Sequence, residues 1–281
     1  THGCLVRATV QPNPPGLGIT FHAGEGVGTV TRAGLQVPPG EPAINPVPRQ
    51  MMQAAIAELA RGEAADVAVT IAIPGGAVLA AKTLNARLGI VGGLSILGTT
   101  GVVVPYSCAA WIHSIHRGID VARAAGLTHL AAATGSTSER VVRELYGLGE
   151  MALLDMGDFV GGTLKYLRRH PVPRLTLAGG FAKLAKLAQG HLDLHSSRSR
   201  LDHGKLAALA AGEGASAVLA QAIADANTGH EMLTLAGAAG FPLAGMVAVR
   251  ALGVARATVG DQVALEVIVV DRQGRIAGRA G

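Results

Sequence analysis

A regular alternation of strand-like and helix-like segments from residue 127 onward is the feature that most limits how this chain can fold. Three apolar runs are each followed by a segment with helical periodicity, over residues 127–147, 151–170 and 173–190. Such alternation predicts parallel strands joined by helical crossovers, the first helix starting with a serine cap at Ser136. Ligands of such sheets bind beyond the carboxyl ends of the strands.

Polar and glycine residues follow these runs, where the carboxyl ends of the strands would meet. Asp158 follows Gly135 at close to the roughly 20 residues that separate a glycine turn from a ribose-binding acid in dinucleotide sites. Asp155 is a rival for that position, and no GxGxxG motif accompanies either acid. The residues expected at this ligand-binding edge are Thr134, Gly135, Asp158, Gly179 and Gly180.

The first part of the chain mixes strand and helix signals. Alternating or β-branched residues predict strands at 19–23 and 67–73. Helical spacing predicts one helix over about 46–60 and another from a cap at Ser107 to residue 125. With 281 residues, the chain exceeds the roughly 250 at which single cores stop growing, so two domains are expected.

A double glycine, Gly75 and Gly76, ends the second of those strands, and we expect a helix carrying Lys82, Asn85 and Arg87 after it. A strand, a glycine turn and a helix start present backbone N–H groups to an anion. The same geometry also forms an ordinary tight turn.

The apolar stretch RLGIVGGLSILGTTG, residues 87–101, raises the question of a membrane. No Asp, Glu, Lys or Arg occurs from Leu88 to Ile115, which is long enough to span a bilayer by count. Its many glycines and Pro105 argue against a spanning helix, because the breaks would leave backbone groups unsatisfied in lipid. We therefore expect this stretch to be no membrane-spanning helix.

The composition favours a folded protein with an anionic small-molecule partner. Hydrophobic residues make up 49% and charged residues 15% of the chain, which argues against disorder. Aromatic residues are only 3%, so the stacking platforms used for nucleic acid are scarce. The net charge is +5, and a basic cluster is either a solvated helix face or a polycarboxylate site. Its members are Lys165, Arg168, Arg169, Arg174, Lys183, Lys186, Arg198 and Arg200.

Cysteine and histidine patterns give weaker signals. Cys4 and Cys108 are too few for a disulfide framework, so a reducing compartment is expected. His113, His116 and Asp120 share a helix face, as plain polar residues or as metal ligands.

The segment HLDLHSSRSRLDHGK would place His191, Asp193 and His195 on one side if it is extended. It allows three interpretations: a metal chelate, an acid/base or substrate-binding cluster, or a polar surface turn. A structural zinc site would need a fourth ligand.

Seven stretches, taken in order, closely resemble the cobalt-precorrin-5B C1-methyltransferase family of anaerobic vitamin B12 synthesis. They are AGEGVGTVTRAGL, EPAINPVPRQM, IPGG, KTLNARLGIVGGLSILGTTGVVVPYS, ATGSTSE, MGDFVG and GHLDLHSSRS. Each is modest alone, but the ordered set is specific, and the likeness runs from the first residues to about Arg200.

This resemblance implies transfer of a methyl group from S-adenosylmethionine to C1 of cobalt-precorrin-5B, giving cobalt-precorrin-6A. It also implies an α/β fold of two domains: an N-terminal α+β layer with a mixed sheet, then a Rossmann-like parallel-sheet domain. We place the first domain at 1–126, the S-adenosylmethionine-binding domain at 127–250, and C-terminal strands packing back on the core at 251–281. Any cobalt belongs to the substrate, so no protein-bound metal is expected.

Site residues follow from the resemblance and from their place in the motifs. The residues at the strand ends named above are expected around the adenosyl and ribose groups. Glu25, His191 and His195 are the candidates for the reacting side, handling a proton or steering the macrocycle. Candidates for binding the anionic tetrapyrrole are Lys82, Arg87, Gly93, Ser95, Thr99, Thr100, Ser196, Ser197 and Arg198. For the stretch 87–101, the resemblance implies a buried loop in which glycines such as Gly93 and Gly98 let backbone N–H groups reach a flat ligand, while Ser95, Thr99 and Thr100 supply hydroxyls.

Other expectations concern the setting of the chain. A non-catalytic tetrapyrrole carrier or chaperone of the same pathway is the main alternative, and a phosphate-binding enzyme built on Gly75 and Gly76 ranks behind it. Family members have a further N-terminal segment that this chain lacks, so the segment is a possible separate partner, as is a second copy of the chain. We expect a cytoplasmic protein with no nucleic-acid or membrane partner.

Overall fold

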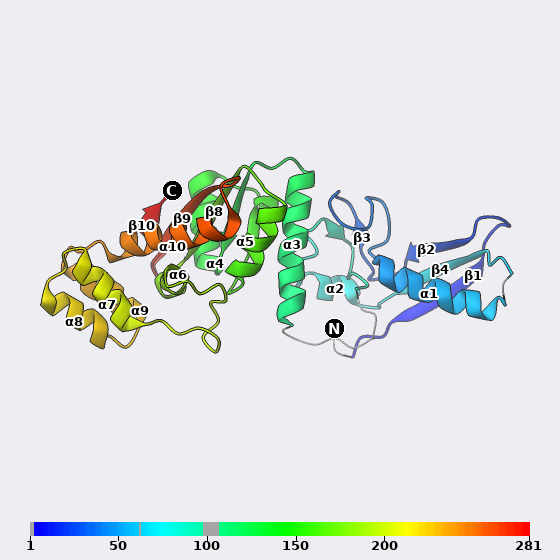
Figure 1. The fold of residues 1–281 in the computed structure, drawn as a ribbon. Helices are drawn as coiled ribbons and strands as arrows, with labels where there is room; N and C mark the ends of the chain where they lie inside the picture. The colour runs from blue at the N-terminus through cyan, green and yellow to red at the C-terminus, as the bar shows by residue number, and fades with distance from the viewer. Residues whose placement is uncertain (1–2, 62, 98–106) are drawn as a thin grey trace. The chain divides into compact units, whose positions relative to one another are not determined.

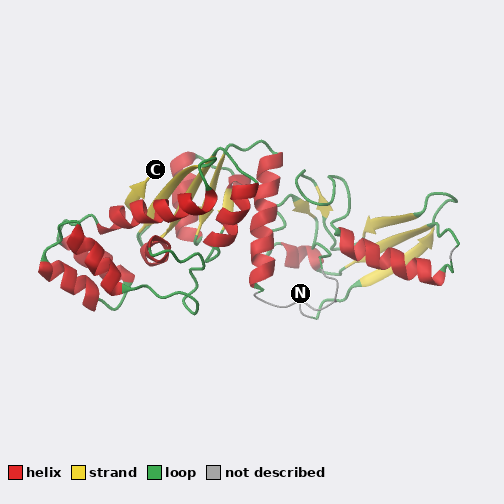
Figure 2. Ribbon diagram, in the orientation of Figure 1, coloured by secondary structure: helices red, strands yellow, loops and turns green. Residues whose placement is uncertain are grey.

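A computed structural model of the chain describes residues 3–61, 63–97 and 107–281. The chain divides into two compact units, Thr1–Ala125 and Gly126–Gly281, called unit 1 and unit 2 below. Figure 1 traces the elements of each unit along the chain, and Figure 2 shows that both units mix helices and strands. None of the described helices is both long and apolar enough to cross a membrane.

Unit 1 contains a small mixed sheet. Strand β4 lies in its centre, antiparallel to β1 and parallel to β2, while β3 and β5 form a separate antiparallel pair. The elements are β1 (Arg7–Pro12), β2 (Ile19–Ala23), β3 (Thr29–Val30), α1 (Pro46–Leu59), β4 (Val67–Ala72), α2 (Gly76–Ala80), β5 (Ile90–Val91) and α3 (Cys108–Ala124). The predicted mixed sheet of the N-terminal layer is therefore confirmed.

The core of unit 1 forms on one face of β4, where every second side chain of the strand is apolar. Val69 and Ile71 point to one face of the sheet and are buried, and Met52 and Ile56 of α1 pack against the same cluster. Helix α1 begins after Asn45 with Pro46 in its first turn, where the missing N–H of proline costs nothing.

The predicted helix carrying Lys82, Asn85 and Arg87 is wrong. Helix α2 ends at Ala80, and turns lead from there to β5. The hydroxyl of Thr83 donates to the Ala80 carbonyl (2.7 Å), and the Asn85 side-chain amide donates to the Gly93 carbonyl (3.0 Å). Polar side chains that bond to backbone groups compete with the helix, which explains its early end.

Three glycine-rich loops of unit 1 pack directly on one another. A Cβ atom at Gly76 or Gly93 would overlap the carbonyl of Gly26, and the Leu94 N–H donates to that same carbonyl (2.9 Å). Gly26 itself has a φ of +72°, in the left-handed region that favours glycine. The absence of side chains at these positions therefore serves contact between backbones.

Unit 2 is a doubly wound α/β unit. Its elements are β6 (His129–Ala133), α4 (Ser136–Tyr146), a 3₁₀ turn (Glu150–Ala152), β7 (Leu153–Asp155), α5 (Val160–Arg169), β8 (Arg174–Gly180), α6 (Phe181–Ala188), α7 (His203–Gly212), α8 (Ala217–Asp225), α9 (Gly229–Ala238), α10 (Leu243–Val259), β9 (Ala264–Val270) and β10 (Ile276–Ala280). The predicted two-part α/β fold is thus confirmed. The expected Ser136 cap is wrong, because Gly135 is the N-cap of α4 and has no side chain to bond with.

The five-stranded sheet of unit 2 has the order β10-β9-β8-β6-β7. Strands β9, β8, β6 and β7 are parallel, and β10 is antiparallel to β9. The chain first winds from β6 outward to β7 and then returns to β8 on the other side of β6. The topological switch point, where open α/β sheets bind ligands, therefore lies between the carboxyl ends of β6 and β8.

Both faces of this sheet are covered. Val141 and Val142 of α4 pack on one face, against Ala131, Ala178 and Ile268. The strand residues between these point to the other face, and Leu175, Leu177, Val267 and Val269 among them are fully buried. Helix α10 packs with α5 and α6 and lies along β9. Through the pairing of β9 with β8, the last two strands belong to the same sheet as β6.

Candidate functional site

The carboxyl edge of the unit 2 sheet brings the predicted cofactor-binding residues together. Thr134 follows β6, Asp158 lies in the turn between β7 and α5, and Gly179 is near the end of β8. The Thr134 N–H donates to the Ala178 carbonyl (2.9 Å). A Cβ at Gly179 would lie 2.8 Å from the Thr134 side chain, so a glycine there lets the two strand ends approach closely.

Gly135 and Gly180 leave open space at this edge. Each is the N-cap of the following helix, α4 or α6, and neither helix start has a side-chain cap. A Cβ at either glycine would meet no atom within 4 Å, and both backbones have conformations open to other residues. Neither packing nor backbone geometry therefore requires glycine at these two positions. The first-turn N–H groups of α4 and α6, which have no side-chain cap, lie next to this open space.

Lys183 joins the ends of two strands across this edge. Its ammonium lies 3.1 Å from Oδ1 of Asp158 and donates to the Thr134 carbonyl (2.9 Å). The Asp158 oxygen is buried, and among the described residues it accepts no aligned hydrogen bond. Sequence reasoning counted Lys183 only in the basic cluster, although its place three residues after a double glycine at a strand end was a usable signal.

The segment from Gln189 to Arg200, called the fastened segment below, is held against the same edge by hydrogen bonds. The Leu194 N–H donates to the Asp158 carbonyl (2.9 Å), and the Gly161 N–H donates to the Leu192 carbonyl (2.8 Å). The ammonium of Lys186, a buried residue, donates to the Leu194 carbonyl (2.9 Å). Asp158 and this segment are therefore neighbours, which brings His191, His195 and the serines after them to the candidate site.

Within this segment the polar groups form a turn and no strand. The Asp193 carboxylate accepts from the His195 N–H (3.1 Å) and pairs with Arg198 (3.4 Å). Nδ1 of His195 lies 2.7 Å from the Ser197 hydroxyl, and Ser196 is exposed beside it. In the described part of the chain, no group of three or more His, Cys, Asp or Glu residues could hold a metal ion.

The predicted basic cluster is partly neutralised within the chain. Lys183, Arg174 and Arg198 each pair with a carboxylate, and Lys186 is buried. The exposed remainder is Lys165, Arg168, Arg169 and Arg200.

The candidate residues of unit 1 meet around the glycine loops. Oε1 of Glu25 lies 3.4 Å from the Gly75 N–H, and the Ser95 hydroxyl lies 3.4 Å from Asn85, whose amide bonds to Gly93. An anion site at Gly75 and Gly76 is disfavoured, because a carboxylate of the chain already approaches it.

The other unit 1 candidates have different surroundings. Lys82 is exposed in the turn after α2, and the Arg87 carbonyl accepts from Arg32 (3.1 Å). The loop hypothesis for 87–101 needs correction at Gly93, which packs on backbone rather than opening to a ligand. Gly98, Thr99 and Thr100 lie outside the described residues.

A cavity of about 350 Å³ opens at the end of β9. His230 and Thr234 of α9, Phe241, and Gln273 and Arg275 of the β9–β10 turn are among its walls. Helix α9 starts against α6, because Gly229 packs on Phe181 and Ala182. Sequence reasoning missed this cavity, since its walls come from segments that no local pattern connects.

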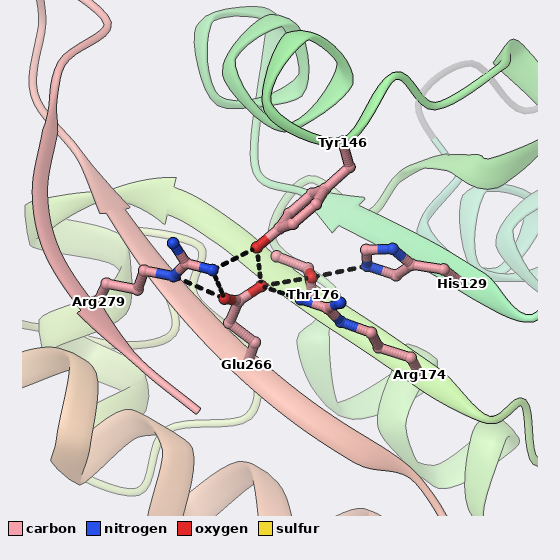
Figure 3. Close-up of polar contacts among 6 residues, drawn as sticks. All are labelled: His129, Tyr146, Arg174, Thr176, Glu266 and Arg279. Atoms are coloured by element: carbon pink, nitrogen blue, oxygen red, sulfur yellow. Dashed lines mark hydrogen bonds and ion pairs between the residues drawn. The ribbon is translucent and has the colours of Figure 1, made fainter.

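A second polar cluster lies at the opposite, amino end of the strands, as Figure 3 shows. Glu266 of β9 is buried and accepts from the hydroxyls of Tyr146 and Thr176. Arg279 of β10 donates to it through Nε (2.7 Å), and Arg174 approaches at 3.3 Å. His129 contacts the Thr176 hydroxyl (2.9 Å).

These contacts shift the pKa values of the cluster, including that of Arg279, which the hydrogen bond to Glu266 raises. Burial raises the pKa of Glu266, but hydrogen bonds from Tyr146, Thr176 and Arg279 outweigh it, and the net pKa is lowered. Burial and the contact with Glu266 raise the pKa of Tyr146. Burial and the nearby Arg174 charge lower the pKa of His129. The cluster thus holds a charged carboxylate beside a neutral phenol and a neutral imidazole.

Comparison with models of known families shows which family the chain belongs to. Residues 1–105 match the family model described as CbiD, and residues 193–281 match the model described as CbiD, C-terminal domain. The chain belongs to the CbiD family.

Close CbiD relatives extend along nearly the whole chain. A protein of Bradyrhizobium sp. named cobalt-precorrin-5B C(1)-methyltransferase is 62% identical over 99% of this chain and 75% of its own length. A protein of the same name from Brucella canis is 59% identical over 99% of this chain and 77% of its own length.

A solved CbiD structure, the 1.9 Å crystal structure of a cobalamin biosynthesis protein from Archaeoglobus fulgidus, matches 70% of this chain and 60% of its own. Its identity is 25% and its TM-score 0.29, a value too low for comparing the two folds. The CbiD models cover Glu25, Gly93 and the segment from Asp193, whereas Asp158 and Lys183 lie between the matched ranges.

Proposed function

We propose that this chain transfers a methyl group from S-adenosylmethionine to C1 of cobalt-precorrin-5B, giving cobalt-precorrin-6A. The observation that carries the proposal is its 62% identity, over 99% of its length, to a protein named cobalt-precorrin-5B C(1)-methyltransferase. The carboxyl edge of the unit 2 sheet supports the proposal, because it combines a switch point, open glycine positions and a carboxylate.

The residues at this edge fit an adenosyl group. Asp158 has a carboxylate whose side chain is 23% exposed although Oδ1 is buried, so its remaining atoms are accessible to ribose hydroxyls. The open space at Gly135 and Gly180 leaves room beside uncapped helix N–H groups. When bound, S-adenosylmethionine supplies a methyl group on a positively charged sulfur.

Methyl transfer from such a sulfur is an in-line displacement, so the chain has to align the reactants and place charge. Thr134, Gly135, Asp158, Gly179 and Gly180 hold the donor in this proposal. His191 and His195, on the fastened segment, accept or steer a proton, and Glu25 is the third candidate for that work.

The macrocycle is anionic, and its carboxylates call for cationic and hydroxyl partners. We assign this role to Lys82, Arg87, Ser95, Thr99, Thr100, Ser196, Ser197 and Arg198. Arg198 is 65% exposed despite its pairing with Asp193, so its guanidinium keeps free donors. The cobalt ion is part of the substrate.

The test is calorimetric titration with S-adenosylhomocysteine, the product of the donor, comparing the wild-type chain with Asp158→Asn. Losing one charged acceptor costs about 1.5–3 kcal/mol, so Kd should rise roughly 10- to 150-fold. Binding of cobalt-precorrin-5B should change by less than about threefold, since that ligand is assigned other partners. Asp225→Asn, an exposed acid on α8, is the matched control and should leave both affinities unchanged.

Two outcomes would contradict this assignment. Equal losses of both ligands would remove Asp158 from the ribose. Macrocycle binding without any S-adenosylhomocysteine binding, also after adding the N-terminal segment of a relative, would favour a tetrapyrrole carrier over a methyltransferase.

A further inference from the structure

Lys183 is a cationic side chain that contacts groups at the ends of several strands at the carboxyl edge of the unit 2 sheet. It lies in the first turn of α6, directly after β8, and its ammonium reaches the Asp158 carboxylate (3.1 Å) and the Thr134 carbonyl (2.9 Å). It therefore connects the ends of the three strands β6, β7 and β8.

The charged groups around Asp158 indicate that Lys183 neutralises its carboxylate. In the part of the chain that the structure describes, Lys183 is the cation within ion-pair distance of Asp158. The fastened segment uses its own charges internally, because Arg198 pairs with Asp193. The Lys183 side chain is 37% exposed, so it stays in contact with solvent and with any ligand at the edge.

We propose that Lys183 is a positioning and specificity residue that neutralises Asp158 and so limits the attraction of the site for a cationic methyl donor. This inference rests on the function proposed above. A lone carboxylate would attract the sulfonium of the donor and not the neutral thioether of the product. Such attraction stabilises the bound donor more than a transition state in which the positive charge is dispersing, and this slows the reaction.

The ratio of the Kd for S-adenosylhomocysteine to the Kd for S-adenosylmethionine isolates this charge effect. Both ligands share the adenosine and amino-acid groups, so a loss of side-chain positioning changes both affinities and cancels in the ratio. Removing one unit charge about 7–10 Å away should change the ratio roughly 3- to 10-fold at an effective dielectric constant of about 40, between the values for a protein surface and for bulk water.

The experiment titrates both ligands into the full chain and into three variants. Lys183→Met should raise the ratio 3- to 10-fold and lower kcat together with KM for the donor. Lys183→Arg, which keeps the charge, should restore the wild-type ratio. Lys205→Met, which removes a 71% exposed lysine paired with Asp202, should leave the ratio unchanged.

Asp158→Asn provides a second, opposite test if Lys183→Met does not fold. It leaves the Lys183 charge uncompensated, so the ratio should fall below that of the wild-type chain. An unchanged ratio in both Lys183→Met and Asp158→Asn, with both ligands bound by the wild-type chain, would overturn the role of Lys183 alone. Failure of the wild-type chain to bind either ligand would instead overturn the proposed function and this inference with it.

Discussion

At the scale of single residues, Glu266 shows how a carboxylate is kept charged inside a sheet. Its side chain is 7% exposed, and Arg174 and Arg279, which pair with it, are 42% and 50% exposed. The network therefore shields the acid while the guanidiniums stay in water. Removing the acid charge would give the Tyr146 and Thr176 hydroxyls a weaker, neutral acceptor.

We predict that Glu266→Gln lowers the free energy of unfolding at pH 7 by roughly 2–4 kcal/mol, because charged hydrogen bonds and a buried ion pair are lost. Urea unfolding followed by circular dichroism measures this change. Glu144→Gln, whose partner Arg140 lies 3.6 Å away on the exposed face of α4, is the control and should cost less than about 0.5 kcal/mol.

The pH dependence of stability should follow the same cluster. Because the folded-state pKa of Glu266 is lowered, its contribution is complete above the ordinary value of 4.5 and is lost as pH falls through the folded pKa. His129, lowered from 6.5, also loses its contribution as pH falls. Tyr146, raised from 10.0, acts in the opposite sense and loses its contribution as pH rises through its folded pKa.

Urea unfolding from pH 7 down to about pH 3 should therefore show stability that falls below pH 4.5 in the wild-type chain and a weaker fall there in Glu266→Gln. Identical acid slopes in the two proteins would argue against a lowered Glu266 pKa.

The sequence allowed single residues to be predicted where a local pattern leads directly to them. Thr134 and Asp158 were found at the strand ends because each closes an apolar run. The amino-end cluster could not be found in this way, because Tyr146 and Arg279 are 133 positions apart. Their meeting depends on which strands pair, and residue spacing carries no signal for that.

At the scale of elements, the glycine loops of unit 1 are held by contacts between backbones. Gly93→Ala would force a methyl group into the Gly26 carbonyl, so we predict that unit 1 loses several kcal/mol of stability or fails to fold. Near- and far-ultraviolet circular dichroism with thermal unfolding measures this loss.

Gly253→Ala is the matched control for this substitution. A Cβ at that position in α10 meets nothing within 4 Å, and the change should raise stability by roughly 0.5–1 kcal/mol. A Gly93→Ala protein as stable as the wild type would show that the loops can separate without cost.

Helix and strand positions were predicted best where periodicity was long. The segments that became α1, α3, β6 and β8 agree closely with the structure. The segment after Gly76 differs, because Thr83 and Asn85 bond to backbone carbonyls and end the helix. Helical spacing of residues does not reveal such side-chain competition.

At the scale of the whole molecule, the chain consists of two units with separate hydrophobic cores, one around Ile44 and Val69 and the other around Ala131 and Ile268. We predict that Glu266→Gln raises amide hydrogen exchange in β6, β8 and β9 and leaves β1, β2 and β4 unchanged, because units of this kind open separately. Mass spectrometry of peptides from both units measures it. Equal acceleration in both units would show that they unfold together.

The length of the chain and its alternation of strand-like and helix-like segments predicted two domains and a parallel sheet. They could not predict the order of the strands in that sheet. Helices α6 to α10 separate β8 from β9 in the sequence, yet Gly180 and Val270 are partners in the sheet. A crossover of this length leaves no local periodicity by which to assign the pairing.

The Glu266 cluster also sets an order of events during protein synthesis. Tyr146, Arg174 and Thr176 leave the ribosome before the acid that they bind, and Arg279 emerges 133 residues after Tyr146. At roughly 5–20 residues per second, that interval lasts about 7–27 s. For about 4–17 s of it, while residues 181–263 between β8 and β9 are made, β8 has no β9 beside it, so the nascent unit exposes an open parallel edge. Until β9 emerges, that edge offers unpaired backbone groups to any other extended segment, so pairing with a wrong strand competes with folding during this interval.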